Sequence, residues 1–256
     1  MSFPLLLLLA TTPLSERLTP PDGWQRVRVE EGSFGAWLRT VPVKPGRPEV
    51  RLFDGSKKRY QEAQWLVLDF DVGTRDLQQC ADAVMRLFAE WQWSAEQRDR
   101  ICFRFTSGDA IAWSKWEKGW RPRVANDRVS LVRSGKNDAT YPNFRKYLDS
   151  IFTYAGTHSL KRDLTSVTDA IRPGDVFIQG GFPGHAVLVV DVVENQKGER
   201  MFALAQSYMP AQDIHVLKNP AASGPWYPVK KSGKLETPEW TFDWSDLMRF
   251  GPSGCP

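Results

Sequence analysis

The stretch IRPGDVFIQGGFPGHAVLVVDVVENQKGERMFALAQSY, from Ile171 to Tyr208, decides the fold of this 256-residue chain. Its apolar runs are separated by turns rich in Gly, Pro or polar residues, which predicts three strands at 175–178, 185–193 and 201–207. The second run is almost continuously apolar, so we expect that strand to be buried on both faces. His185 stands at its start, directly after a glycine. A histidine in this place is either a base directed into a cleft or a polar residue held by the turn.

The flanking sequence adds helices and further strands. The clearest helix is expected over residues 75–93, where apolar side chains recur at helical spacing. Shorter helices are expected at 33–39, after a turn at 106–108, and at 143–160. Further strands are expected on both sides of an Asp54–Gly55 turn and at 101–105. The polar stretch at 126–137 is expected to be a loop with a short strand, and the C-terminal part a long loop that wraps over the domain and ends in a short element. Because helices and strands are mixed without strict alternation, we expect one α+β domain over residues 17–256, with a largely antiparallel sheet.

The composition limits the partners and cofactors. The chain is 41% apolar and 25% charged, with a net charge of +4 spread along the sequence, so no nucleic-acid partner is expected. The three cysteines, at positions 80, 102 and 255, are too few for a disulfide framework and leave at least one thiol free. With three scattered histidines they form no zinc motif, so we expect no metal and no organic cofactor. The sequence does not indicate the oligomeric state.

The N-terminus begins MSFPLLLLLATTPLSERL, a short apolar run followed by small residues. This pattern indicates a signal peptide over residues 1–16 and therefore a periplasmic or secreted protein. The alternative is a docked N-terminal segment of a cytoplasmic protein. No other apolar run approaches the roughly 18 residues that a membrane span needs, so no integral membrane segment is expected in the mature chain.

Cys80 is the first candidate for chemistry. Asp76 is expected to cap the long helix, with Gln79 completing a capping box, which places Cys80 in the first turn. The positive end of the helix dipole favours a thiolate there, and a nucleophilic cysteine also needs a base and a donor for the oxyanion. Gln78 and Gln79 are candidate donors. The alternative is that Cys80 packs in the core as a small apolar residue.

His185 is the candidate base. On the third predicted strand Gln206 lies within reach of its imidazole, so we expect Gln206 to hold Nδ1 while Nε2 faces the thiol. Asp191 falls inside the buried strand, must therefore be paired, and is a candidate supporting residue. His158 and His215 have no evident partner and are expected at the surface or in turns.

Two stretches resemble cysteine peptidases and amidases of the NlpC and CHAP types. RPGDVFIQGGFPGHAVLVVDVVENQKGERMFALAQS resembles their histidine-bearing hairpin, and QQCADAVMRLFAEW resembles their nucleophile helix. The resemblance implies a papain-like core with Cys80 as nucleophile, His185 as base and Gln206 as the orienting residue. It also implies an amide substrate of the peptide or cell-wall type. About 100 residues separate Cys80 from His185, which is more than in those families and requires an insertion.

Further phrases, such as FGAWLRTVPV and AQSYMPAQDIHVLKNP, resemble an uncharacterised bacterial domain-of-unknown-function family of the 4846 type. A different candidate nucleophile lies in FTSGDAIAWSKWEKGW, where Thr106 and Ser107 precede a predicted helix; the alternative is a turn that caps this helix. The sequence therefore leaves open a structural role in the cell envelope and two functions at the candidate site. One is a thiol-dependent hydrolase, and the other is a non-catalytic module of the same fold that binds a peptide or glycan.

Overall fold

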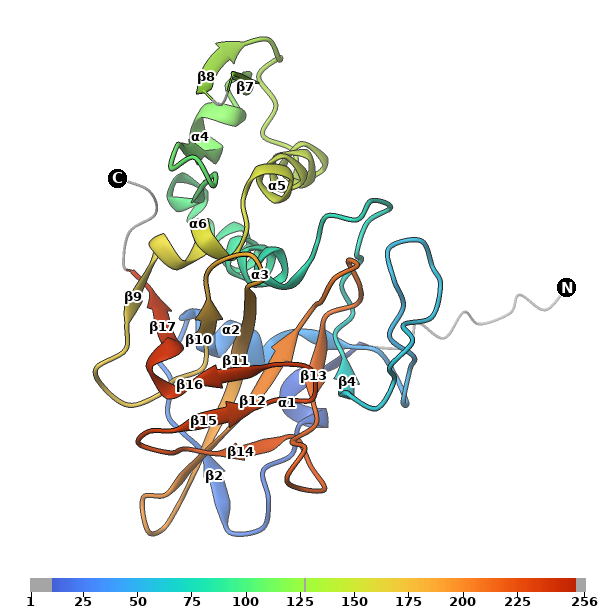
Figure 1. Cartoon of the computed structure of the whole chain (residues 1–256), viewed down its shortest axis with the longest axis vertical. Helices are drawn as coiled ribbons and strands as arrows, with labels where there is room; N and C mark the ends of the chain where they lie inside the picture. Colours follow the sequence, from blue (N-terminus) through green and yellow to red (C-terminus); the bar gives the residue numbers. More distant parts are fainter. Residues whose placement is uncertain (1–10, 127, 252–256) are drawn as a thin grey trace, which may run out of the picture.

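An antiparallel sheet of nine strands forms the centre of the computed structural model, which describes residues 11–126 and 128–251 (Figure 1). In spatial order its main path is β4 (Gln64–Val67), β13 (His215–Leu217), β12 (Arg200–Gln206), β11 (His185–Asn195), β10 (Val176–Gln179), β17 (Leu247–Phe250) and β9 (Leu164–Ser166). Beside this path, β14 (Trp226–Pro228) pairs with β12 and β2 (Trp24–Arg26) pairs with β11. The expected α+β class with an antiparallel sheet is confirmed.

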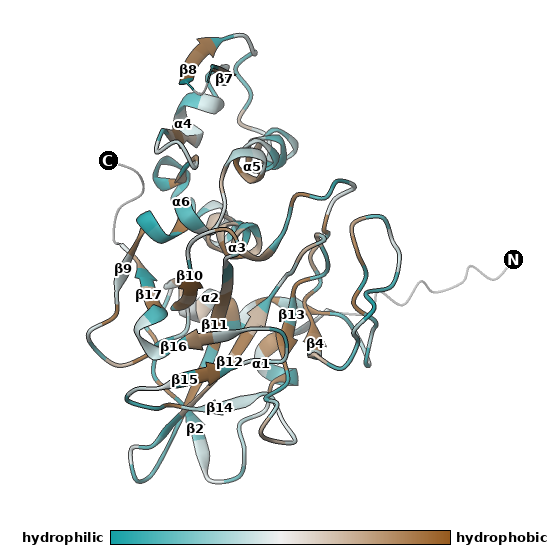
Figure 2. Cartoon of the chain, in the orientation of Figure 1, coloured by the Kyte–Doolittle hydropathy of each residue, from teal (hydrophilic) through white to brown (hydrophobic). Residues whose placement is uncertain are grey.

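Strand β11 is buried on both faces, as its apolar run predicts. Ala186, Leu188 and Val190 belong to the core on the helical side of the sheet. Val187 and Val189 belong to a second core on the opposite side. This alternation is the period of a strand, and Figure 2 shows β10 and β11 as strongly hydrophobic.

The alternation breaks at one point in β11. The pairing with β12 shifts between Val189 and Asp191, so that Val190 is the extra residue of a β-bulge. Asp191 therefore follows Val190 onto the helical side. There its carboxylate binds the side chains of Arg26 and Arg39.

The helices α1 (Leu14–Arg17), α2 (Phe34–Thr40) and α3 (Cys80–Ser94) contribute to the core on one side of the sheet. Ser33 caps α2 by accepting from the backbone N–H of Ala36 at 3.2 Å, which confirms the helix expected there. The start expected for α3 is wrong. Its N-cap is Gln79, whose backbone N–H donates to Asp82 at 3.1 Å, and Cys80 is therefore the first helical residue.

A segment of helices and two β-hairpins lies between α3 and the histidine-bearing hairpin, and it forms the upper part of Figure 1. Its elements are the 3-10 turn Arg98–Arg100, β5 (Cys102–Arg104), β6 (Ala110–Ala112), α4 (Trp113–Trp116), β7 (Trp120–Ala125), β8 (Arg128–Arg133), α5 (Tyr141–Tyr154) and α6 (Thr157–Arg162). The short strand expected within the polar stretch at 126–137 is β8, which pairs with β7. The single helix expected at 143–160 is two helices, divided around Gly156.

The C-terminal part ends in a short strand, β17, as expected, but the long loop expected before it contains further strands. It contains β14, the hairpin β15 (Lys234–Glu236) and β16 (Thr241–Asp243), the 3-10 turn Trp244–Asp246, and β17. Leu235 and Phe242 from this hairpin pack against Phe177 and Phe202 of the sheet in the second core. Strands β14 and β17 thus extend the sheet, and the β15–β16 hairpin covers its face as a second layer.

The structure also bears on the expected signal peptide and on the strands expected around Asp54–Gly55. Residues 12–17 belong to the fold, because β1 (Thr12–Pro13) pairs with β3 (Pro42–Val43) and Leu14 is buried. Residues 1–10 of the expected leader lie outside the described residues. Around Asp54–Gly55, only isolated bridges such as Arg51 to Lys57 replace the first expected strand. In the described part of the chain, no helix has the length and apolar character to cross a membrane.

Candidate functional site

His185 and Gln206 lie side by side at one end of the sheet. His185 begins β11, Gln206 ends the neighbouring strand β12, and His185 Nε2 lies 2.9 Å from Gln206 Oε1. Each residue is only 1% exposed. The structure thus brings these two predicted residues together, but the nitrogen that meets Gln206 is Nε2, not the expected Nδ1.

His215 joins this pair, so the surface position expected for it is wrong. It lies in β13 directly opposite Gln206 and is fully buried. Its Nε2 lies 3.5 Å from Gln206 Nε2, and its Nδ1 lies 2.9 Å from the backbone oxygen of Asp213. The one signal in the sequence was the flanking apolar pair Ile214 and Val216, which marks a short buried strand.

Two charged residues from distant segments complete the cluster. Gln206 Nε2 donates to Glu239 Oε2 at 2.7 Å, and the same oxygen lies 2.5 Å from Lys58 Nζ. Lys58 comes from the segment before β4, and Glu239 comes from the turn between β15 and β16. Sequence reasoning missed both residues, because only the tertiary fold brings them to the sheet.

The imidazole of His185 points toward the C-terminal wrap. Its ring centroid lies 4.8 Å from that of Tyr208, 5.3 Å from that of Trp240 and 5.9 Å from that of Phe242. Burial lowers the pKa of His185 to about 4, with Lys58 acting in the same direction and the Gln206 bond opposing it. Burial likewise lowers the pKa of His215 to about 3. Both imidazoles are therefore neutral near pH 7.

Cys80 approaches the same end of the sheet from the helical side. Its thiol is free and lies against the backbone N–H of Ala186, the residue after His185. Burial, together with the charge of Asp82, raises the pKa of Cys80 to about 11 despite the nearby backbone N–H groups. Among the hydrogen bonds of the described residues, none joins this thiol to the His185 imidazole. The resting groups are an uncharged thiol and an uncharged imidazole.

The two glutamines before Cys80 differ in what they offer. Gln79 donates its side-chain amide to Asp76 at 2.9 Å and is therefore committed elsewhere. Gln78 is buried; its Oε1 accepts from Arg86 at 3.0 Å, while its Nε2 has no hydrogen-bond partner among the described residues. The backbone N–H groups of Cys80 and Ala81 also lie near the thiol. These backbone groups are the better placed donors for an oxyanion.

The remaining candidates lie apart from this cluster. Asp191 is bound by Arg26 at 2.6 Å and Arg39 at 2.9 Å, so it anchors the fold and does not support His185. Thr106 and Ser107 are exposed in the turn between β5 and β6, where Ser107 donates to Asp109, and they do not cap a helix. His158 is exposed on α6, as expected.

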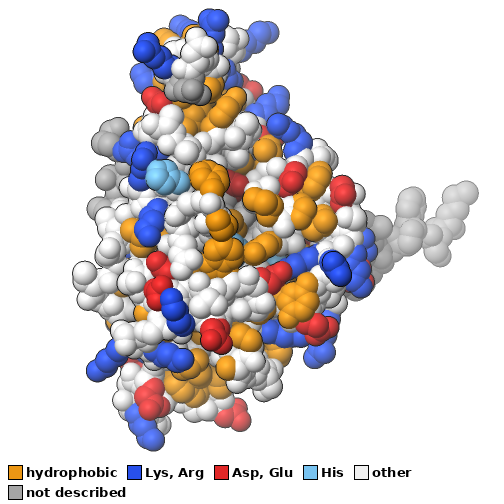
Figure 3. Space-filling view, in the orientation of Figure 1, with side chains coloured by type: hydrophobic (Ala, Val, Ile, Leu, Met, Phe, Trp, Pro, Cys, Tyr) orange, Lys and Arg blue, Asp and Glu red, His pale blue; other side chains and the backbone are white. Residues whose placement is uncertain are grey.

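Exposed apolar side chains flank the cluster. Phe182, in the turn before His185, is 89% exposed, and Met209, in the turn after Gln206, is 67% exposed. Hydrophobic side chains gather across the middle of the face shown in Figure 3, over the end of the sheet next to α3. Large exposed apolar residues that adjoin a polar cluster are typical of a binding surface.

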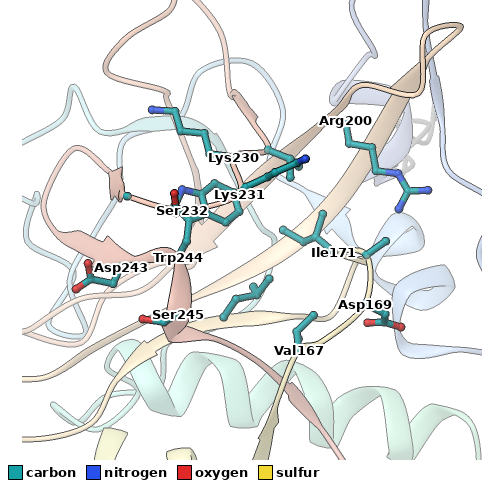
Figure 4. Close-up of a pocket in the computed structure, with 14 residues that line it drawn as sticks. Val167, Asp169, Ile171, Arg200, Lys230, Lys231, Ser232, Asp243, Trp244 and Ser245 are labelled. Carbon is teal, nitrogen blue, oxygen red and sulfur yellow. The ribbon is translucent and has the colours of Figure 1, made fainter.

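A separate pocket of about 470 Å³ opens between the segment at 167–171, the connection from β14 to β15, and the turn at 244–246 (Figure 4). Lys230 and Lys231 stand on one side of it and Asp169 on the other. None of the residues that line it belongs to the cluster around His185. We therefore assign the candidate site to the cluster and not to this pocket.

The comparisons with known proteins give a family. The family model described as Domain of unknown function (4846) matches residues 14–249, and the chain belongs to this family. No curated protein and no solved structure matches the chain. The papain-like core therefore has no structural relative to confirm it. Within residues 11–126 and 128–251, no group of three or more His, Cys, Asp or Glu side chains is arranged to hold a metal ion.

Proposed function

We propose that this protein is a thiol-dependent hydrolase, a peptidase or amidase, with Cys80 as nucleophile and His185 as base. One observation carries the proposal: Cys80 is the first residue of α3, and its thiol lies against the backbone of the strand that begins with His185. A helix start supplies unpaired N–H groups and the positive end of the dipole. A cysteine, a histidine and a residue that holds the histidine are the parts that nucleophilic catalysis requires.

The reaction would proceed in two steps. The Cys80 sulfur attacks the carbonyl carbon while the ring nitrogen of His185 that is not bonded to Gln206 takes the thiol proton. That proton then passes to the leaving amine as the C–N bond breaks, which leaves a thioester. Water, deprotonated by the same nitrogen, cleaves the thioester and restores the thiol. The thiol reaches this end of the sheet from the helical side and the imidazole lies on the opposite side, and no hydrogen bond joins the two groups at rest. Substrate binding therefore has to bring them together.

The substrate class belongs to the same proposal. The family resemblance of the two motifs implies a peptide or cell-wall-like amide, and the expected signal peptide would bring the protein to it in the periplasm or outside the cell. Phe182 and Met209, exposed on the two turns beside the site, would contact apolar groups of such a substrate.

The test is hydrolysis of a panel of peptide and muropeptide amides, with mass spectrometry to trap an acyl-enzyme. Cys80→Ala should abolish both hydrolysis and the adduct, and Cys80→Ser should form at most a slow ester. Thr106→Ala and Ser107→Ala are the controls, because these hydroxyls lie in a remote turn, and both should remain active. Activity that survives in Cys80→Ala would refute the proposal.

One observation favours a second function, a non-catalytic module that binds a peptide or glycan. The thiol and the imidazole are uncharged and are not bonded to each other at rest. In this case Cys80 is a packing residue, and Cys80→Ala binds the ligand as tightly as the wild type. Calorimetry with peptides and glycan fragments separates the two functions.

A further inference from the structure

We propose that Glu239 and His215 are positioning residues that orient the Gln206 amide and thereby fix the proton of His185 on Nε2. Nδ1 then remains the unprotonated nitrogen. That Nδ1 acts as the base rests on the function proposed above. The position of the proton itself follows from the contacts of five residues: His185, Gln206, His215, Glu239 and Lys58.

The inference begins at His215. Its Nδ1 lies 2.9 Å from the backbone oxygen of Asp213, and a carbonyl oxygen can only accept, so Nδ1 carries the proton. Because burial lowers the pKa of this histidine to about 3, the ring is neutral and its Nε2 bears a lone pair. The carboxylate of Asp213 is held by Lys44 and by the backbone N–H of Arg51, which fixes the segment that carries the carbonyl.

The orientation of Gln206 follows from its neighbours. One end of its amide faces two acceptors, Glu239 Oε2 at 2.7 Å and His215 Nε2 at 3.5 Å. Only the NH2 group, with its two hydrogens, can meet both acceptors, since the amide oxygen would oppose a carboxylate and a lone pair. The shorter contact is also charge-assisted, so Glu239 is the stronger determinant and His215 the weaker one. Lys58, at 2.5 Å, holds the carboxylate in place.

The proton of His185 is then determined. With the NH2 group directed at Glu239, the amide oxygen lies 2.9 Å from His185 Nε2 and must receive a proton from it. The His185 ring is neutral near pH 7, so Nδ1 has no proton. Of the described residues, none forms a hydrogen bond with this nitrogen, which leaves it available to a ligand or a thiol. Tyr208, Trp240 and Phe242 surround the ring and hold its plane.

Two-bond 1H–15N correlation spectra of ring-labelled protein at pH 7 test the assignment without any substrate. In the wild type, His185 should show a protonated Nε2 and an unprotonated Nδ1, and His215 should show the reverse. Glu239→Gln presents an amide that can donate to Gln206, so the Gln206 amide can reverse. The preference of His185 for the Nε2–H form should then fall by about tenfold. Glu239→Asp should restore part of it.

The matched control is Glu236→Gln, an exposed residue of β15 in the same hairpin, which should leave both spectra unchanged. Thermal unfolding establishes that each variant is folded. A wild-type His185 protonated on Nδ1 would overturn the assignment, as would a folded Glu239→Gln protein with the wild-type pattern. Cys80→Ala should keep the wild-type pattern, so a correct tautomer in a protein without hydrolase activity refutes only the proposed function.

Discussion

Strand β11 carries two buried polar side chains, and the fold treats them differently. Asp191, on the helical side, has a carboxylate bonded by Arg26, by Arg39 and by the backbone N–H of Val192. His185, on the opposite side, is bonded through one nitrogen to Gln206. Both residues are 1% exposed, so burial alone does not distinguish them.

The difference shows how a structural polar group can be separated from a candidate for chemistry. Asp191 uses its acceptors on partners that hold α2 and β2 to the sheet, and it has little left to offer a ligand. His185 keeps one ring nitrogen without a bond to a described residue, and the backbone N–H of the next residue, Ala186, lies against a free thiol. A buried polar group with unused bonding capacity is the better functional candidate.

Removal of the Asp191 carboxylate should have the largest effect. Asp191→Ala leaves two arginines without their anion, and the free energy of unfolding should fall by about 4 kcal/mol. Urea unfolding measures this loss. Glu194→Ala is the control. Glu194, also on β11, makes a half-buried ion pair with Arg200 of β12, and its loss should cost less than about 1 kcal/mol. Equal losses in the two variants would contradict the structural role of Asp191.

The protein should lose stability in acid because His185 is buried in its neutral form. Its pKa is about 4 in the folded protein against an ordinary value of 6.5, so the unfolded chain binds the proton more readily. Protonation of His185 therefore does not affect the free energy of unfolding above pH 6.5. It lowers this free energy by about 3 kcal/mol as the pH falls from 6.5 to about 4. Urea unfolding of wild type and His185→Gln between pH 7 and 4 should show a steeper decline in the wild type. Parallel curves would contradict the buried neutral histidine.

The Cys80 thiol should be slow to alkylate in the free protein. A pKa of about 11 in place of 9.0 lowers its thiolate fraction about 100-fold at pH 7. Iodoacetamide labelling followed by mass spectrometry should show a rate that keeps rising up to about pH 11. A fast reaction at pH 7 that His185→Ala removes would instead reveal a thiolate–imidazolium pair in the resting protein.

Phe182 should give the smallest change in stability. Phe182→Ser removes an 89% exposed side chain, so the free energy of unfolding should change by less than about 0.5 kcal/mol. If Phe182 contacts substrate, the KM of an apolar peptide should rise by about fivefold while kcat stays the same. Val124→Ser, at the exposed tip of β7, is the control and should change neither quantity.

The sequence predicted those elements whose position depends on hydrophobic periodicity and capping residues close by in the chain. The hairpin β10–β11–β12 and helix α2 lie close to their expected positions, because alternation and a capping serine specify them. The start of α3 was misplaced, since Asp76 has the sequence of a cap but accepts from the backbone N–H of Ala211 in a distant loop. Helix α3 is instead capped by Gln79, together with Asp82 in its first turn.

Half of the candidate site could not be predicted, because it depends on contacts between distant segments. His185 and Gln206 lie on adjacent strands and were paired from the sequence. His215, Glu239 and Lys58 reach them only when β13 docks on β12 and the C-terminal hairpin closes over the sheet. The apolar neighbours of His215 mark a strand but not its partner, and a lone lysine or glutamate in a polar loop carries no periodic signal that would reveal such a contact.

The β-bulge at Val190 has a consequence for the folding of this hairpin. In a regular ladder, a slip of one residue costs little in backbone hydrogen bonds, although it would turn His185 to the opposite face from Gln206. In this protein the extra residue of β11 lies opposite one position on β12, between Leu204 and Ala203, where the pairing shifts. In a slipped pairing the extra residue would face a part of β12 where the hydrogen-bond pattern is regular, and this pairing would be less stable. The bulge at Val190 therefore fixes the register of β11 against β12, and this register places His185 within hydrogen-bond distance of Gln206.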